Sequence, residues 1–360
     1  MSLDRKVLIC LFLLFMWMKA VHAQMPTPPS SQTSRPLTVD RDPAPSIDPD
    51  TPAPTQAAPD AIHSVGQIGK DETGRYTLEA DAFEVQLNVS VTDFSGYPAV
   101  NLTKTDFRVF EDGVPQTITG FRHEDIAVSI GLLIDSSASM FDKRAAVEKA
   151  ALDLVRLSNP KDEEFLVDFS SKAYIDADFT SSVDKLQQGL RYVKSTGGTA
   201  AYDAVMASST YLSRHAKNTK QVPLLITDGE DNASRTSLQE MIQKIQGMNG
   251  PVIYCVGLLF GQDTDKVEAR NSRALLEQIA EKTGGAAFFP RSLKEVDNIA
   301  SIVAEDIRTQ YTIGYHSTNP PSNGGYRTVH VDAVGPKNQK LKVRTRSGYL
   351  AKGTPRASNQ

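Results

Sequence analysis

Five oxygen-bearing side chains in the middle of the sequence lie where predicted strands end or predicted helices begin. Three of them form a D-x-S-x-S motif after the apolar run 127–134, one lies in a Gly-Gly-Thr sequence, and one follows the apolar run 222–227. These residues are Asp135, Ser137, Ser139, Thr199 and Asp228. In open α/β sheets, ligands bind beyond the carboxyl ends of the strands, near the point where the strand order reverses. We therefore expect the five side chains to gather at one edge of a sheet.

The chemistry of this set favours a hard divalent cation. Two carboxylates and three hydroxyls offer only oxygen, which suits Mg²⁺, Mn²⁺ or Ca²⁺, whereas zinc and copper favour nitrogen and sulfur. We expect Mg²⁺ first. The two acids would roughly neutralise the ion, and the neutral hydroxyls would leave it able to accept a carboxylate from outside. The alternative is that the hydroxyls only cap helices and the aspartates only form turns.

Residues 125–310 alternate between apolar runs and amphipathic segments. The runs predict buried strands at 127–134, 165–169, 222–227, 252–259 and 286–289, with an edge strand near 173–179. Helices are expected at about 143–157, 182–194, 200–214, 236–248, 271–283 and 292–309. Such alternation is typical of an α/β fold, a doubly wound and mostly parallel sheet with helices on both faces.

The segments 76–124 and 311–350 on either side have a β pattern. The first contains an alternating strand at 85–91 and a turn at 111–113, and we expect 117–121 to continue that hairpin. Strands are expected in the second at 311–315, 327–333, 341–345 and 349–350. Each segment holds too few strands to be stable alone, and the ends of inserted domains tend to lie close together. We predict one β-sandwich, made from both segments, into which the α/β domain is inserted.

Residues 125–310, which contain these motifs, resemble the von Willebrand factor type A family. The metal-ion-dependent adhesion site of that family has the pattern D-x-S-x-S, then T, then D, and the five residues named above match it without substitution. The resemblance implies a metal bound by these residues and a protein partner whose Asp or Glu completes the metal's shell. It also implies a last helix that shifts when a partner binds. Here helix 292–309 would then pull on strand 311–315.

The flanks narrow the resemblance to secreted bacterial VWFA-related proteins of the acidobacterial type. The sequences that carry it are Asp106-Phe107, Phe110-Glu111-Asp112-Gly113, Gly198-Thr199-Ala200-Ala201-Tyr202-Asp203-Ala204, Tyr311-Thr312-Ile313-Gly314-Tyr315 and Ser347-Gly348-Tyr349. This similarity extends over almost all of 80–350. It implies a fold and a site, and it names no ligand.

The N-terminus predicts export. Residues 1–23 have a basic start, a 12-residue apolar run and the ending Val21-His22-Ala23, which is the pattern of a cleaved signal peptide. An uncleaved anchor is the alternative, but the apolar run is shorter than the ~20 residues that a spanning helix needs. We thus expect a protein that is secreted or lies in the periplasm or cell envelope, with no transmembrane segment after cleavage. The Pro-rich stretch 24–75 is expected to be a disordered linker and 351–360 a disordered tail.

Composition excludes several classes of protein. The formal charge of −4 offers no positive field for nucleic acid or an anionic membrane. After cleavage only Cys255 remains, which excludes an internal disulfide and a cysteine-based zinc site. The sequence has no G-x-S-x-G motif, and Asp135 occupies the place of a nucleotide-binding glycine loop. We therefore expect a non-enzymatic, metal-dependent binding protein, with a structural or scaffolding part of an envelope assembly as the alternative.

Cleavage after Ala23 would remove Trp17, the only tryptophan. The exported protein should therefore begin at Gln24 and show fluorescence of the tyrosine type. N-terminal sequencing and an emission spectrum of the exported form check this. Tryptophan emission from that form, or an N-terminus before Met18, would contradict cleavage.

Overall fold

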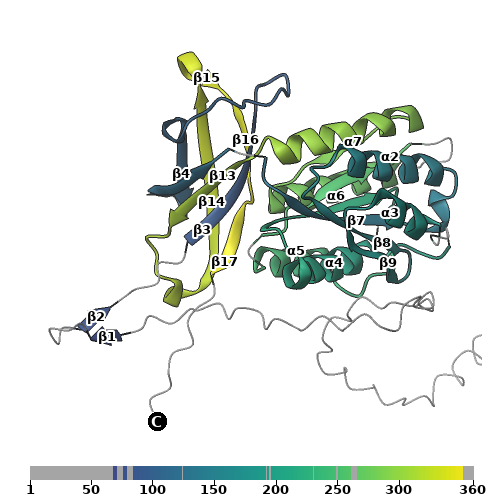
Figure 1. Cartoon of the computed structure of the whole chain (residues 1–360), viewed down its shortest axis with the longest axis horizontal. Helices are drawn as coiled ribbons and strands as arrows, with labels where there is room; N and C mark the ends of the chain where they lie inside the picture. Colours follow the sequence, from purple (N-terminus) through teal and green to yellow (C-terminus); the bar gives the residue numbers. More distant parts are fainter. Residues whose placement is uncertain are drawn as a thin grey trace, which may run out of the picture. The chain divides into compact units, whose positions relative to one another are not determined.

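The computed structural model describes residues 68–70, 76–78 and 84–351, except residues 124, 192, 194, 195, 230, 249 and 261–265. The expected signal peptide, nearly all of the expected linker and the tail beyond Ala351 lie outside these residues. The described part forms an α/β domain and a β-sandwich (Figure 1). Within it, no helix is both long enough and apolar enough to cross a membrane.

A six-stranded sheet forms the centre of the α/β domain, in the order β12-β11-β10-β7-β8-β9. Its strands are β7 (Val128–Asp135), β8 (Glu163–Phe169), β9 (Ala173–Thr180), β10 (Lys220–Thr227), β11 (Tyr254–Gly257) and β12 (Ala287–Phe288). Only β9 is antiparallel to its neighbour. The central strands β7 and β10 are buried almost throughout, as expected for parallel strands covered on both faces. The predicted doubly wound sheet is confirmed, and its order reverses between β7 and β10.

Helices cover both faces of this sheet. They are α2 (Arg144–Leu157), α3 (Val183–Leu190), α4 (Ala201–His215), α5 (Leu238–Gln246), α6 (Lys266–Thr283) and α7 (Leu293–Arg308). Apolar residues of α2, α3 and α7 pack on one face, and those of α4, α5 and α6 pack on the other. Each helix has one buried side because its apolar residues recur every three or four positions.

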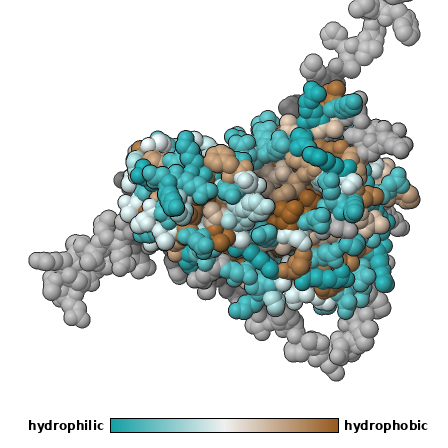
Figure 2. Space-filling model, turned by 90° about the horizontal axis from the view of Figure 1, so that it is seen from above, coloured by the Kyte–Doolittle hydropathy of each residue, from teal (hydrophilic) through white to brown (hydrophobic). Residues whose placement is uncertain are grey.

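The covering by α2 and α7 is incomplete. Figure 2 shows apolar side chains gathered in a hollow on this face of the domain. Here a cleft of about 20 Å³ lies between the two helices, with Ala151 and Leu154 of α2 on one side and Ile299 and Val303 of α7 on the other. The cleft also reaches the sheet, where Leu224 and Ile226 of β10 line it.

Two sheets form the sandwich, and each combines strands from before and after the α/β domain. The strands before it are β3 (Glu84–Thr92), β4 (Phe107–Glu111), β5 (Val114–Gln116) and β6 (Ile118–Arg122). Those after it are β13 (Tyr311–His316), β14 (Gly325–Gly335), β15 (Gln339–Lys340), β16 (Lys342–Arg344) and β17 (Gly348–Ala351). One sheet has the order β16-β3-β13-β6, and the other has the order β15-β14-β4-β5, with β17 also paired to β14. The predicted insertion is confirmed.

Other short elements complete the described part. The strands β1 (Ile68–Lys70) and β2 (Tyr76–Leu78) form a separate antiparallel pair. Short 3₁₀ helices cover Lys104–Asp106, Ala138–Met140, Pro321–Asn323 and Pro336–Asn338. None of these elements belongs to either large sheet, and only the turn at Ala138–Met140 bears on the candidate site.

One expectation about the sandwich is wrong. The turn at 111–113 does form, with Asp112 and Gly113 at positive φ, and it joins β4 to β5. However, 117–121 does not continue that hairpin, because β6 crosses to the other sheet and pairs with β13. The crossing buries Ile118 in the sandwich core and gives β13 a second neighbour. Local alternation could not reveal this, since it is the same for a strand in either sheet.

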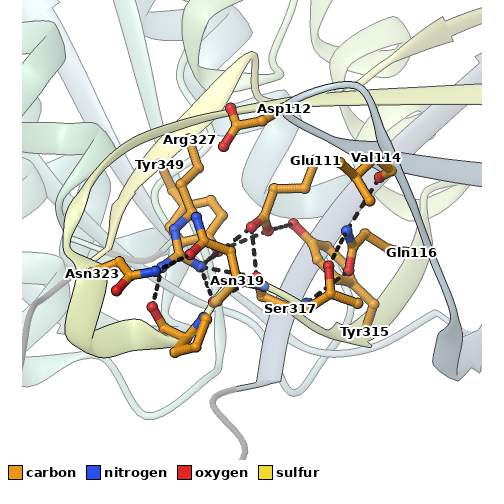
Figure 3. A network of polar contacts seen from close by, with 12 residues as sticks. Glu111, Asp112, Val114, Gln116, Tyr315, Ser317, Asn319, Asn323, Arg327 and Tyr349 are labelled. Atoms are coloured by element: carbon orange, nitrogen blue, oxygen red, sulfur yellow. Dashed lines mark hydrogen bonds and ion pairs between the residues drawn. The ribbon is translucent and has the colours of Figure 1, made fainter.

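A buried ion pair joins the two halves of the sandwich (Figure 3). Arg327 of β14 lies 3.2 Å from Glu111 of β4, and both side chains are 1% exposed. The hydroxyls of Tyr315, Ser317 and Tyr349 donate to the Glu111 carboxylate. Arg327 also donates to two backbone carbonyls of the loop after β13, those of residues 319 and 320. Such partners are what a buried pair needs, because its desolvation otherwise exceeds its attraction.

The α/β domain holds a buried carboxylate of the opposite kind. Glu164 on β8 is 1% exposed, and neither of its oxygens has a hydrogen-bond partner among the described residues. Burial raises the pKa of Glu164 to about 8, and the charges of Asp162 and Glu163 act in the same direction. The folded protein therefore retains a proton on Glu164 at pH values where the unfolded chain has lost it.

This difference makes stability depend on pH. Between about pH 4.5 and 8 the folded state binds the extra proton, so the free energy of unfolding should fall as pH rises, by at most ~1.4 kcal/mol per pH unit. Glu164→Gln should flatten this slope. Urea unfolding of both proteins from pH 6 to 8 measures the slope. This pH range lies between the pKa of Asp135, about 6, and the pKa of Lys220, about 8. Equal slopes for the two proteins would contradict the assignment.

Candidate metal centre

Asp135 is the last residue of β7 and lies at the carboxyl edge of the sheet. One of its carboxylate oxygens accepts from the Thr227 hydroxyl at 2.5 Å, and the other accepts from the backbone N–H of Ser137 at 2.8 Å. Burial raises the pKa of Asp135 to about 6, and the nearby charge of Asp228 adds to the increase. The carboxylate is thus held in place and lies where a positive charge would stabilise it.

A chain of hydrogen bonds links Ser137 and Ser139 to Asp228. The two serine hydroxyls are 3.1 Å apart, and the Ser139 hydroxyl donates to an oxygen of Asp228 at 2.8 Å. Asp228 directly follows β10, the neighbour of β7, so strand pairing brings the two motifs together. Four of the five predicted residues therefore gather at one point, where the sheet order reverses.

Thr199 lies in a loop that crosses beside the D-x-S-x-S segment. The N–H of Thr196 donates to the carbonyl of Ser136 at 2.8 Å, and Thr199 itself is buried. Its N–H donates to the side chain of Asn232 at 2.8 Å. A Cβ on the preceding Gly198 would lie only 2.6 Å from that Asn232 oxygen, so the loop needs glycine there. Between the described residues, no hydrogen bond joins the Thr199 hydroxyl to the other four.

Lys143 is part of this site, and its role was not predicted from the sequence. Its ammonium donates to the second oxygen of Asp228 at 2.6 Å, with 16% of the lysine side chain and 2% of the aspartate side chain exposed. From the sequence, Lys143 is predicted only as the start of a helix. Its position eight residues after Asp135 was the available signal, since the turn at 138–140 folds the chain back toward the motif.

Two further positioning residues were also missed. Thr227 orients Asp135, and Asn232 orients Thr199. Both lie within four residues of Asp228, which is the signal that could have found them. Asp231 has a structural part, because its carboxylate accepts from the N–H of Tyr202 in the first turn of α4. Glu230 lies outside the described residues.

The donor set fits a hard divalent cation bound mainly by hydroxyls. Within the described part, no three His, Cys, Asp or Glu side chains gather to hold a metal ion, so a metal here would depend on serine and threonine oxygens. Asp135, Ser137, Ser139 and Asp228 are placed to hold it, with Thr199 beside them. When bound, the ion would act as a Lewis acid that accepts an external carboxylate. The two carboxylates place negative charge at this point. Burial raises the pKa of Asp135, and the ammonium of Lys143 pairs with Asp228, so a cation is favoured here.

Several solved structures are similar to part of this chain. A von Willebrand factor type A protein from Catenulispora acidiphila is 13% identical, with a TM-score of 0.43. The matched region covers 76% of this chain and 75% of that chain. BatB from Bacteroides thetaiotaomicron is 17% identical, with 50% of this chain and 98% of that chain covered and a TM-score of 0.40. Proximal thread matrix protein 1 from the mussel byssus, with a zinc-occupied MIDAS motif, is 17% identical. It covers 56% of this chain and 50% of its own, with a TM-score of 0.44.

No curated protein matches the chain. The family model of the von Willebrand factor type A domain does match, at residues 129–302. This range begins in β7 and ends in α7, so it contains all of the central sheet except Val128, together with all five predicted site residues. The protein therefore contains a von Willebrand factor type A domain, inserted between the two halves of a β-sandwich.

Proposed function

We propose that this protein is an exported, non-catalytic binding protein that uses a divalent cation, Mg²⁺ first, to hold a protein partner. The observation that carries the proposal is the meeting of Asp135 and Asp228 at the reversal of the sheet order. The backbone N–H of Ser137 contacts Asp135, and the hydroxyls of Ser137 and Ser139 lead from there to Asp228. Two carboxylates roughly balance a divalent charge, and hydroxyl ligands leave the ion free to bind one more anionic oxygen.

The partner should offer an Asp or Glu carboxylate with an apolar group beside it. The carboxylate would complete the metal's shell. Phe141, two residues after Ser139, is 74% exposed, which is unusual for a ring of this size. An exposed aromatic side chain next to a charged site is typical of a protein-binding surface, because it supplies contact area around the polar anchor.

The location of the protein belongs to the same proposal. The signal-peptide pattern of residues 1–23 supports secretion, or residence in the periplasm or cell envelope. The motifs shared with secreted bacterial VWFA-related proteins of the acidobacterial type support it too. They extend beyond the type A domain into β4, β13 and β17 of the sandwich.

One observation favours the alternative, a scaffolding protein that needs no metal. The ammonium of Lys143 already neutralises part of the Asp228 charge. A site closed by this ion pair could serve only to hold the loop against α2. Metal-dependent partner binding separates the two functions, because a scaffold would bind equally well after metal removal.

Metal should stabilise the folded protein. A ligand that binds only the native state at 100 times its Kd adds about 2.7 kcal/mol. Millimolar Mg²⁺ or Mn²⁺ should therefore raise the Tm of the mature protein, and Asp135→Ala should abolish the increase. Thermal unfolding with metal and with EDTA measures this. Asp231→Ala is a matched control, since it removes a nearby carboxylate that braces α4 and should leave the metal response intact.

Partner capture provides the second readout. Envelope extracts passed over the immobilised protein should yield a bound protein with Mg²⁺ that EDTA releases. A metal response that is equal in wild type and Asp135→Ala, or capture that EDTA does not change, would refute the proposal.

Lys143 should weaken metal binding, because its ammonium competes for Asp228. Lys143→Met should bind Mg²⁺ or Mn²⁺ about 5- to 10-fold more tightly, which corresponds to ~1 kcal/mol. Calorimetric titration measures the affinity. Lys149→Met is the control, since that exposed lysine of the same helix pairs with Asp153 instead. If the affinity of Lys143→Met is unchanged or lower, then the ammonium does not compete with the ion.

A further inference from the structure

A polar cavity lies away from the candidate metal centre, at the opposite edge of the type A sheet. It has a volume of about 140 Å³ and is lined by residues of both the type A domain and the sandwich. The start of β10 contributes Lys220, and the end of α6 contributes Lys282. The end of β6 contributes Arg122, and the segment before β17 contributes Arg346.

The charge of this cavity is of one sign. Four of its lining residues are basic and none is acidic. In the described part of the chain, none of the four forms an ion pair with a carboxylate within 4.0 Å, although nine other lysines and arginines do. The lining therefore carries positive charge that its direct neighbours do not compensate.

Lys220 shows this most clearly. The residue is 4% exposed, and its ammonium donates to the backbone carbonyl of Ile307 at the end of α7. Burial lowers the pKa of Lys220 to about 8. The carboxylates of Asp306, Asp125 and Asp162 favour the charged form only from beyond ion-pair distance. A buried ammonium that has one neutral acceptor retains most of its desolvation cost.

Arg346 has an unused donor. One terminal nitrogen donates to the backbone carbonyl of Gln86, but the buried Nε has no hydrogen-bond partner among the described residues. Burial lowers the pKa of this guanidinium as well. A buried donor without an acceptor is costly, and the planar guanidinium is suited to the paired oxygens of an oxyanion.

We propose that this cavity binds a small tetrahedral oxyanion with two negative charges, such as inorganic phosphate or the phosphate group of a small ester. An ion of this kind would give Lys220 a counter-charge and Arg346 an acceptor. The volume agrees, because about 140 Å³ corresponds to roughly four or five water molecules at ~30 Å³ each. Since the lining residues come from both domains, a bound anion stabilises their contact.

Phosphate binding to the mature protein tests the proposal. Calorimetric titration and thermal unfolding are carried out in EDTA, with sodium phosphate against sodium chloride at equal ionic strength. We expect one phosphate bound per chain and a higher Tm in phosphate than in chloride. No binding to the wild type, or the same Tm in both salts, would overturn the proposal, whatever the variants do.

Variants locate the site. Arg346→Gln and Lys220→Met should each weaken phosphate binding at least tenfold, because each removes a charge-assisted hydrogen bond. Lys217→Gln is the matched control, since this lysine is three residues from Lys220 but 84% exposed and outside the cavity. Full retention of affinity in both cavity variants would also overturn the proposal.

Two more experiments complete the test. One distinguishes a phosphate ester from inorganic phosphate as the ligand, and the other distinguishes the anion site from the metal centre. Competition by glycerol phosphate at the affinity of free phosphate supports an ester as the ligand, and failure to compete supports the inorganic ion. Asp135→Ala should bind phosphate as the wild type does, since its change lies at the other edge of the sheet. Failure of the metal centre and failure of the anion site are therefore distinguishable.

Discussion

The pairing of β7 with β10 is the constraint on which the site depends. These strands are the two at which the order of the sheet reverses, so the segments that leave their carboxyl ends diverge to opposite sides. The parallel register pairs Ile134 with Ile226, so Asp135 lies opposite Thr227 and Asp228 follows one residue later at the same edge of the sheet. Apolar burial on both faces of these strands holds this geometry, because a shift in register would place polar neighbours in the core.

The sandwich depends on a different interaction. Its two halves are far apart in the sequence, and the ion pair between Glu111 and Arg327 joins them inside the core. Three hydroxyls and two carbonyls hydrogen-bond to this pair, and only the Nε of Arg327 has no partner among the described residues, so the pair helps to specify which strands meet. Glu164 shows the contrast. Its buried carboxyl has no hydrogen bond among the described residues, and burial raises its pKa to about 8, so the group retains its proton at neutral pH.

The two domains are joined through the end of α7. Only Thr309 and Gln310 separate α7 from β13. Asp306 forms an ion pair with Arg344 of β16, and the Gln310 side chain donates to Ser90 of β3 and to Tyr254 of β11. A movement of α7 at the metal site would therefore have to break polar contacts at the base of the sheet. The basic cavity adjoins this point through Lys220, so an anion bound there would act on the same contacts.

Much of this structure was predictable from the sequence, because it depends on local patterns. The apolar runs predicted the strands of the type A sheet, and the D-x-S-x-S, Thr and Asp residues predicted a candidate site at the carboxyl edge of that sheet. The insertion followed from the β pattern on both flanks. These features depend on hydrophobic periodicity and residue spacing, and both can be read from one sequence.

The tertiary structure alone decided which distant residues meet. The crossing of β6 to the second sheet, the Lys143 ammonium at Asp228 and the ion pair between Glu111 and Arg327 have no local signature. The same is true of the basic cavity, whose residues come from β6, β10, α6 and the segment before β17. Charge and burial at these places depend on contacts between segments that are far apart in the sequence. Glu111 and Arg327, for example, are separated by 216 positions. Residue spacing therefore predicted which oxygen-bearing side chains meet at the edge of the sheet, whereas packing determined the charges that surround them.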